Sequence, residues 1–131
     1  MSQQDVEIIL VRRWASMLIM PVFLAGANGD LLYYNEPAER LLGKRFEESG
    51  PMPVEEFGAI FDTRDEQGNA IPASELPLGV ALIHRRPAHG QVRFKALDGV
   101  WRDIQVTGLP LEAQGGRHLG ALAIFWEAEP S

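Results

Sequence analysis

The sixteen residues from Asn28 to Gly43 constrain the fold of this chain more than any other stretch, because they combine a turn, a strand and a capped helix. Asn28-Gly29 is the dipeptide favoured in tight hairpin turns whose two central residues need positive φ. Residues 31–34, Leu-Leu-Tyr-Tyr, are apolar and aromatic, as is typical of a strand. The run therefore predicts a hairpin that leads directly into a helix.

The helix that follows has both its start and its end signals in the sequence. Asn35 can accept a backbone N–H from the first turn, so it is the expected N-cap. Pro37 falls in that first turn, where its missing N–H is tolerated, and Gly43 is a natural C-cap. These signals predict a short helix over residues 36–42. Its apolar face is formed by Ala38, Leu41 and Leu42.

Hydrophobic periodicity predicts the other elements. Apolar residues at three- and four-residue spacing over 3–18 indicate an amphipathic helix. Ser74 is the expected N-cap of a helix over 75–85, which Pro87 ends, and a shorter helix is expected over 55–61. Alternation or short apolar runs predict strands over 18–26, 31–35, 91–97, 100–109 and 118–126.

One strand is expected at the centre of the sheet. Residues 118–126 are apolar on both faces, which is typical of a strand covered on both sides. Residues 18–26 have the same character, so the two strands are expected to be neighbours.

Alternation also assigns side chains to the two faces of the sheet. If Val100, Ile104 and Val106 face the helices, Trp101 faces the other way. Large apolar patches are rarely left in water, so this outer face needs a cover. The helix over 3–18, which carries Trp14, is the available cover, and we expect it to lie across the outer face.

Taken in order, these segments resemble a PAS domain. Residues 28–43 resemble the second strand and first core helix of that family, and 67–78 (QGNAIPASELPL) resemble the segment before its long helix. Leu97-Asp98-Gly99 resembles the hairpin between the third and fourth strands. Residues 106–111 (VTGLPL) resemble the end of the fourth strand, and 120–126 (GALAIFW) resemble the fifth.

The resemblance implies an α+β fold. Its sheet has five antiparallel strands in the order 2-1-5-4-3, with helices on one face and an N-terminal amphipathic helix on the other. The chain divides into that helix (1–17), a PAS domain (18–127) and a short tail (128–131). The Asp-Ile-Thr that often leads from the last PAS strand to an output domain is replaced by Trp126-Glu127-Ala128, so we expect a stand-alone module.

PAS domains usually hold a small molecule between the inner face of the sheet and the helices. The apolar positions of such a pocket are equally well explained as ordinary core residues. Tyr34 aligns with the position where light-sensing members of the family place a tyrosine against their chromophore, although a buried phenol can instead bond to a helix carbonyl. The pocket that the resemblance implies consists of Leu32, Tyr34, Phe57, Leu82, Phe94, Ile104 and Val106.

Residue types argue against a resident cofactor. A flavin light sensor of this family needs a reactive cysteine in an Asn-Cys-Arg motif, and the chain has no cysteine. Haem needs an axial ligand, but His84 lies beside Arg85 and Arg86 at the expected helix end, where a surface role suits the helix dipole. With His89 and His118, the histidines show no metal-ligand spacing. We expect no flavin, haem or metal, while an unknown small molecule stays open.

Composition and motifs limit the partners and the chemistry. A net charge of −6 disfavours a nucleic-acid-binding surface. No apolar run approaches the roughly twenty residues of a membrane-spanning helix, and no signal peptide is recognisable, so a cytoplasmic location is expected. The sequence shows no phosphate-binding glycine loop and no nucleophile elbow, so we expect a protein that is not an enzyme.

Two functional hypotheses follow. The first is a non-catalytic sensory or interaction module in signal transduction, which forms a homodimer and passes its signal to an unidentified signalling protein. The alternative is a carrier or ligand sensor whose inner pocket is the function. An unrecognised enzyme would require titratable groups clustered in that same pocket. For the first hypothesis, the expected interface on the N-terminal helix and outer sheet face consists of Val6, Ile9, Leu10, Trp14, Trp101 and Trp126.

Overall fold

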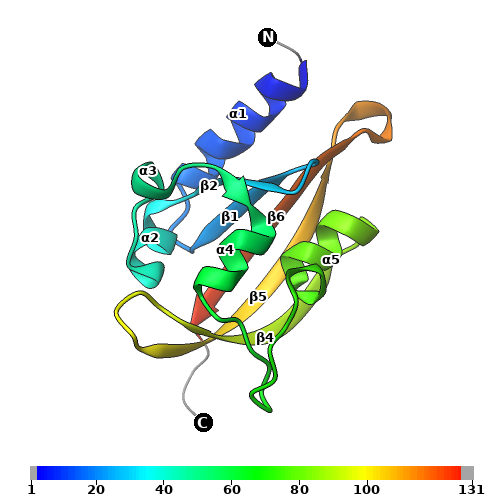
Figure 1. Cartoon of the computed structure of the whole chain (residues 1–131). Coiled ribbons are helices and arrows are strands. Elements are labelled where there is room, and N and C mark those ends of the chain that lie inside the picture. Colours follow the sequence, from blue (N-terminus) through cyan, green and yellow to red (C-terminus); the bar gives the residue numbers. More distant parts are fainter. Residues whose placement is uncertain (1–2, 128–131) are drawn as a thin grey trace.

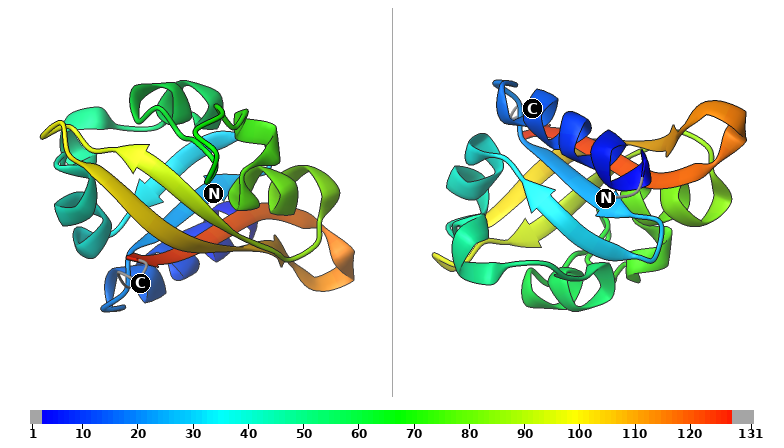
Figure 2. Two further views of the ribbon diagram at one scale, coloured as in Figure 1. Left: turned by 90° about the horizontal axis from the view of Figure 1, so that it is seen from below. Right: turned by 90° about the horizontal axis from the view of Figure 1, so that it is seen from above.

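A computed structural model describes the backbone of residues 3–127 and, apart from residues 3–5 and Phe57, their side chains. The expected tail over 128–131 and the first two residues of the expected helix lie outside this range. The described residues form one antiparallel sheet with helices on both faces (Figure 1). In Figure 2, α1 lies on one side of the sheet, and α4 and α5 lie on the other.

Six strands and five α-helices alternate irregularly along the described chain. The strands are β1 (Val22–Gly26), β2 (Asp30–Tyr34), β3 (Met52–Pro53), β4 (Ala88–Lys95), β5 (Trp101–Glu112) and β6 (His118–Glu127). The helices are α1 (Gln3–Ser16), α2 (Glu36–Leu42), α3 (Phe46–Ser49), α4 (Val54–Ile60) and α5 (Pro77–His84), with 3-10 turns at η1 (Ala73–Glu75) and η2 (Gln114–Gly116).

The sheet has the order β3-β2-β1-β6-β5-β4. This confirms the predicted order of five strands and adds a sixth, β3, at one edge. The sequence pattern missed β3 because it is only two residues long and contains Pro53, which suits only an edge strand. The central pair is β1 and β6, as their two-sided apolar sequences predicted, with Val22 opposite Ile124.

The turn between β1 and β2 differs from the predicted type. Gly29 has φ of 91°, and its N–H donates to the carbonyl of Gly26 at 2.9 Å. Asn28 has an ordinary φ, since positive values among the described non-glycine residues occur at Asp62 and Arg85 alone. The connection is therefore a three-residue loop that ends in a left-handed glycine, and the expectation of two positive φ values is wrong.

The start and end signals of α2 behave as the sequence predicts. Asn35 caps the helix by accepting the N–H of Ala38, Pro37 lies in the first turn, and Gly43 ends the helix with φ of 83°. By contrast, Ser74 does not cap α5. That helix begins at Pro77 after the separate 3-10 turn η1, and its N-cap, Leu76, offers no side-chain bond.

Two apolar clusters lie on opposite faces of the sheet. The inner cluster packs the sheet against α2, α4 and α5, and it includes Phe94, Ile104 and Val106 as alternation predicts. Val100 is a correction, because it precedes β5 in the hairpin turn and is half exposed. The outer cluster consists of Ala15, Val22, Leu24 and Leu122, with Ile8, Val11, Leu18, Leu32, Tyr33, Leu111 and Ile124 packed around it.

Helix α1 covers the outer face of the sheet, as expected, but the side of the helix that meets the sheet is not the side that carries Trp14. Ile8, Val11 and Ala15 pack on β1, β2 and β6, whereas Trp14 is 47% exposed and points away from the cluster. Trp101 lies outside the covered area and is about as exposed as Trp14. Within the described residues, no helix combines the length and apolar character needed to cross a membrane.

Candidate functional site

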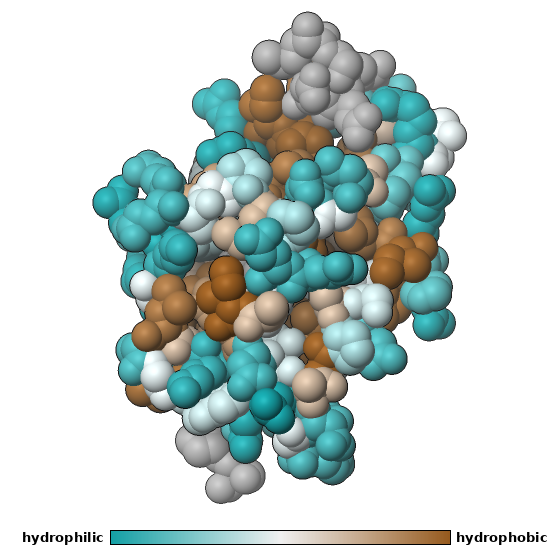
Figure 3. Space-filling view, viewed as in Figure 1, coloured by the Kyte–Doolittle hydropathy of each residue, from teal (hydrophilic) through white to brown (hydrophobic). Residues whose placement is uncertain are grey.

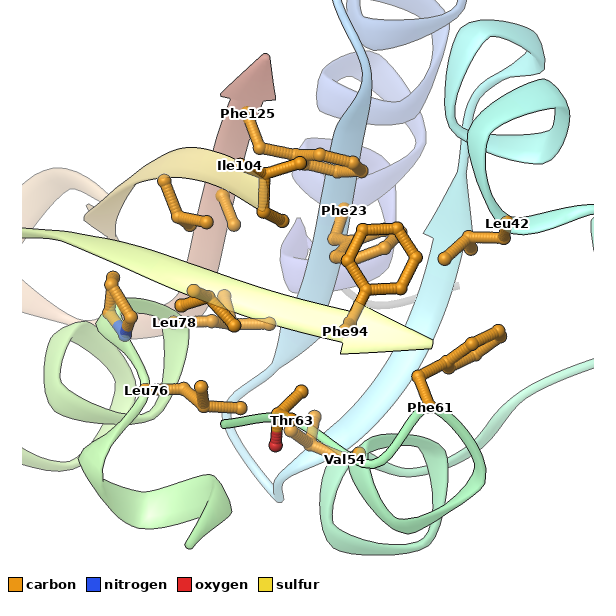
Figure 4. Close-up of a pocket in the computed structure, with 15 residues that line it drawn as sticks. Phe23, Leu42, Val54, Phe61, Thr63, Leu76, Leu78, Phe94, Ile104 and Phe125 are labelled. Carbon is orange, nitrogen blue, oxygen red and sulfur yellow. The ribbon is translucent and has the colours of Figure 1, made fainter. Parts of the chain in front are cut away.

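An apolar cavity lies between the inner face of the sheet and the helices. Its volume is about 80 Å³, and side chains from the sheet, α2, α4 and the segment before α5 converge on it (Figure 4). Its lining residues are Phe23, Leu42, Val54, Gly58, Phe61, Thr63, Leu76, Pro77, Leu78, Val92, Phe94, Ile104, Val106, Ala123 and Phe125.

Aromatic rings occupy much of the space around this cavity. Phe23 and Phe125 have ring centroids 4.6 Å apart, and Phe61 meets Phe94 edge to face at 6.2 Å. Of the described lining residues, only Thr63 has a polar side chain, and its hydroxyl donates to the carbonyl of Ile71 at 3.2 Å. The described lining could therefore bind a ligand only through its shape and through apolar contacts. It contains no ionisable side chain that could take part in catalysis.

Three of the predicted pocket residues line this cavity, namely Phe94, Ile104 and Val106. Leu82 packs against the inner cluster from α5 but lines a separate groove. Leu32 is a correction, because it belongs to the outer cluster. The irregular register between Leu24 and Ala25 breaks the alternation of the neighbouring strand, so counting residues assigns Leu32 to the wrong face. The side chain of Phe57 is outside the described part.

Tyr34 is buried beside the cavity rather than in its lining. Its hydroxyl donates to the carbonyl of Lys44 at 3.0 Å and shares a hydrogen bond with the hydroxyl of Ser49 at 3.1 Å. Phe46 meets its ring edge to face, with centroids 5.3 Å apart. Burial raises the pKa of the Tyr34 phenol, the bond to Ser49 partly offsets this, and the charge of Glu39 adds to the rise. These partners give Tyr34 a structural role.

The sequence-based prediction omitted several lining residues, most clearly Phe23, Phe61 and Phe125. Alternation could have found two of them, because Phe23 and Phe125 occupy the inward positions of β1 and β6. Phe61 directly follows α4, inside the range 55–61 that is predicted to be a helix, but the expected pocket includes Phe57 from that range instead.

The predicted interface residues of α1 lie on its solvent side. Leu10 is 60% exposed, and Val6, Ile9 and Trp14 are each between two fifths and half exposed. Apolar surface is visible over the α1 end of the molecule in Figure 3. Because Ile8 and Ala15 are packed on the sheet, α1 carries apolar residues on two sides, of which the sheet uses one.

Trp126 links this surface to the far half of the outer face. It lines an open groove together with Ile19 and Met20, which follow α1 in the chain and are exposed. The His89 ring lies beside that of Trp126, with centroids 5.9 Å apart and the planes tilted by 33°. The ring nitrogens of His89 form hydrogen bonds with Thr107 at 2.8 Å and Gln105 at 3.0 Å. Trp101 is exposed on the same face.

The three histidines lie at separate places in the fold. His84 ends α5 and is exposed, and His89 is engaged on the outer face. His118 begins β6 beside a different groove. Across the described residues, no group of three or more histidine or acidic side chains is arranged to hold a metal ion.

Sequence comparisons find no relative of this chain. No protein-family model matches it, and no curated protein matches it.

Solved structures do match, over nearly the whole chain. The PAS domain of a protein from Colwellia psychrerythraea superimposes with a TM-score of 0.64 at 17% identity, covering 93% of this chain and 97% of the other. A PAS domain from a two-component sensor histidine kinase gives 0.58 at 15% identity, covering 96% and 100%. The chain has the PAS fold.

The matched structures also include LOV (light-oxygen-voltage) proteins. A variant of RsLOV gives a TM-score of 0.73 at 17% identity, covering 100% of this chain and 72% of that one. At such low identity the likeness concerns the fold, and the functional argument depends on this chain's own surfaces.

Proposed function

We propose that this PAS domain is a non-catalytic sensory or interaction module in signal transduction, which forms a homodimer through α1 and the outer face of the sheet. The observation that carries the proposal is the two-sided apolar character of α1. One side is used by the sheet, and the other, with Val6, Ile9, Leu10 and Trp14, faces solvent. Large contiguous apolar patches on soluble proteins usually mark an interaction site.

A second copy of the chain is the partner that this surface suits best. Packing α1 against a second α1 would bury Leu10 and its neighbours on both chains at once, because a two-fold interface uses the same patch twice. Trp126, with Ile19 and Met20, extends the apolar surface beyond the end of α1. The signal would then pass to an unidentified signalling protein.

Contacts between α1 and the inner core supply a route for that signal. The Arg12 guanidinium lies over the ring of Tyr33 at 4.6 Å and over that of Phe46 at 5.5 Å. Phe46 in turn packs on Tyr34 inside the core. A ligand or partner that favours one packing of these rings would bias the position of α1, which is a population shift between two arrangements.

The alternative, a ligand carrier with an inner pocket, receives less support. The inner cavity of about 80 Å³ is smaller than the cavity of roughly 150 Å³ that binds benzene in another protein. A flavin or haem would require the rings of Phe23, Phe61 and Phe94 to move apart. We therefore propose that the domain works without either cofactor.

The same proposal covers location and partners. The net charge of −6 supports a role that involves no nucleic acid, and the chain is proposed to act in the cytoplasm. One matched structure is a PAS domain from a two-component sensor histidine kinase, which supports a sensory role.

Sedimentation velocity over a range of concentrations tests the dimer. The natural chain is expected to sediment as a dimer, and Leu10→Glu is expected to shift it to monomer because a charge would be buried in the interface. Ile60→Glu is the matched control, since Ile60 is an exposed apolar residue on α4, on the opposite face. A natural chain that stays monomeric, or equal effects of both variants, would contradict the proposal.

A further inference from the structure

A second, larger groove opens on the helix side of the sheet, between the β1–β2 turn and α5. Its volume is about 590 Å³, which is within the range of sites for small ligands and several times the volume of the inner cavity. Figure 1 shows the elements around it. The lining residues are Ala27, Asn28, Gly29, Asp30, Pro53, Val54, Glu55, Ala73, Ser74, Gly79, Leu82, Ile83, Arg85 and His118.

Acidic and basic side chains enter this groove from opposite sides. Asp30 begins β2, and Glu55 lies in the first turn of α4, which contacts β2 and β3. Arg85 follows α5, which contacts β5 and β6, and His118 begins β6. In the sheet, β1 separates β3 and β2 from β6 and β5. The two acidic side chains and the two basic side chains therefore enter the groove from different sides.

Most of these groups have unused bonding capacity. Among the described residues, the Arg85 guanidinium and the Glu55 carboxylate form no ion pair or side-chain hydrogen bond with another protein group. The Nδ1 of His118 is buried and likewise lacks a hydrogen-bond partner there. Buried polar atoms are seldom left without a hydrogen-bond partner. A polar ligand in this groove would supply the partner that the described residues do not.

The backbone at Arg85 is also unusual. Arg85 has φ of 54° and ψ of 42°, and it ends α5 in the left-handed conformation that glycine or asparagine normally takes. An arginine at this position is disfavoured by its own backbone. A binding role for the guanidinium accounts for an arginine at a position where glycine would be easier to fold.

We propose that this groove binds a small zwitterionic ligand of the amino-acid class. Arg85 and His118 hold its carboxylate, Asp30 and Glu55 hold its ammonium group, and its apolar side chain lies on the groove's hydrophobic residues. Those residues are Val54, Leu82 and Ile83. The proposal goes beyond the dimer and does not depend on it, since the groove and α1 are on opposite faces of the sheet.

Amide chemical shifts in a titration with L-leucine test this ligand class. The expected result is saturable shifts that gather around residues 27–30, 54–55, 83–85 and 118. Two analogues isolate the charges, because 4-methylpentanoate lacks the ammonium group and 3-methylbutylamine lacks the carboxylate. Each is expected to bind at least about tenfold more weakly than leucine. Absence of saturable shifts, or equal binding of all three compounds, would overturn the proposal.

Two variants separate binding from folding. Arg85→Gly removes the guanidinium and relieves the left-handed backbone, so the melting temperature should stay equal or rise while leucine binding falls at least about tenfold. Glu55→Gln should weaken leucine binding but leave 4-methylpentanoate binding unchanged. Arg86→Gly is the control, because Arg86 lines a different groove. If Arg85→Gly binds leucine like the natural chain, the proposed site is wrong.

Discussion

At the scale of single residues, Asn35 joins three elements through one buried amide. Its Oδ1 accepts the N–H of Val22 at 3.0 Å and that of Ala38 at 3.2 Å. Its Nδ2 donates to the carbonyl of Ala15 at 3.0 Å and to that of Met20 at 2.9 Å. The side chain thereby caps α2 and also ties the end of α1 to β1. The sequence predicted the first role, but the second depends on contacts distant in the chain.

Replacing Asn35 by alanine should therefore destabilise the domain by about 3 kcal/mol, because four backbone groups, three of them in buried hydrogen bonds, lose their partner. Urea unfolding followed by far-ultraviolet circular dichroism measures the change. Asn69→Ala serves as the control, since Asn69 is exposed and should change stability by less than about 0.5 kcal/mol. Similar values for the two variants would show that the Asn35 network is unimportant.

Tyr34 gives a second prediction at this scale. Tyr34→Phe keeps the ring but removes the bonds to Lys44 and Ser49, so it should cost about 1–2 kcal/mol at neutral pH. The folded protein raises the pKa of Tyr34 above the ordinary value of 10.0.

The sign of the resulting pH dependence follows from proton binding. Above pH 10 the unfolded chain releases the Tyr34 proton while the folded chain still holds it, so stability is complete below that pH and falls as pH rises toward the folded pKa. Unfolding experiments between pH 8 and 11 should show a smaller alkaline loss for Tyr34→Phe, with the remaining loss owed partly to Tyr33, whose pKa burial also raises. An unchanged alkaline loss would contradict this role.

At the scale of elements, α1 provides a matched pair of neighbouring isoleucines. Ile8 packs in the outer cluster, and Ile9 is exposed on the other side of the helix. Ile8→Asp should lower the free energy of unfolding by about 2–4 kcal/mol, because it places a carboxylate against the sheet. Ile9→Asp should leave the stability of the dilute monomer nearly unchanged and weaken association. Urea unfolding and sedimentation, measured on both variants, check the pair.

The same helix shows where sequence reasoning reaches its limit. The spacing of apolar residues in 3–18 correctly predicts a helix on the outer face. However, apolar residues occur on two sides, and periodicity alone does not decide which side meets the sheet. The helix that carries Trp14 is expected to cover the sheet, but the small Ala15 makes the close approach and Trp14 is half exposed. The prediction that Leu32 lines the inner pocket is wrong for a related reason. A break in the register between β1 and β2 moves Leu32 to the outer face of the sheet.

At the scale of the whole molecule, the sheet order was predictable and the sites were less so. The two-sided apolar character of β1 and β6 indicated their central position, and the helix signals followed from local chemistry. The cavity is lined by Phe61, which directly follows α4 and is not among the expected pocket residues. The groove near Arg85 is assembled from separate segments of the chain, so its charges become neighbours only in the folded structure.

The central claim is that two copies of this chain associate. Native mass spectrometry of the natural chain at high micromolar concentration tests this claim most directly. The account predicts a main species with twice the mass of one chain, which Leu10→Glu converts to the single-chain mass while Ile60→Glu does not. A natural chain that shows only the single-chain mass at this concentration would contradict it.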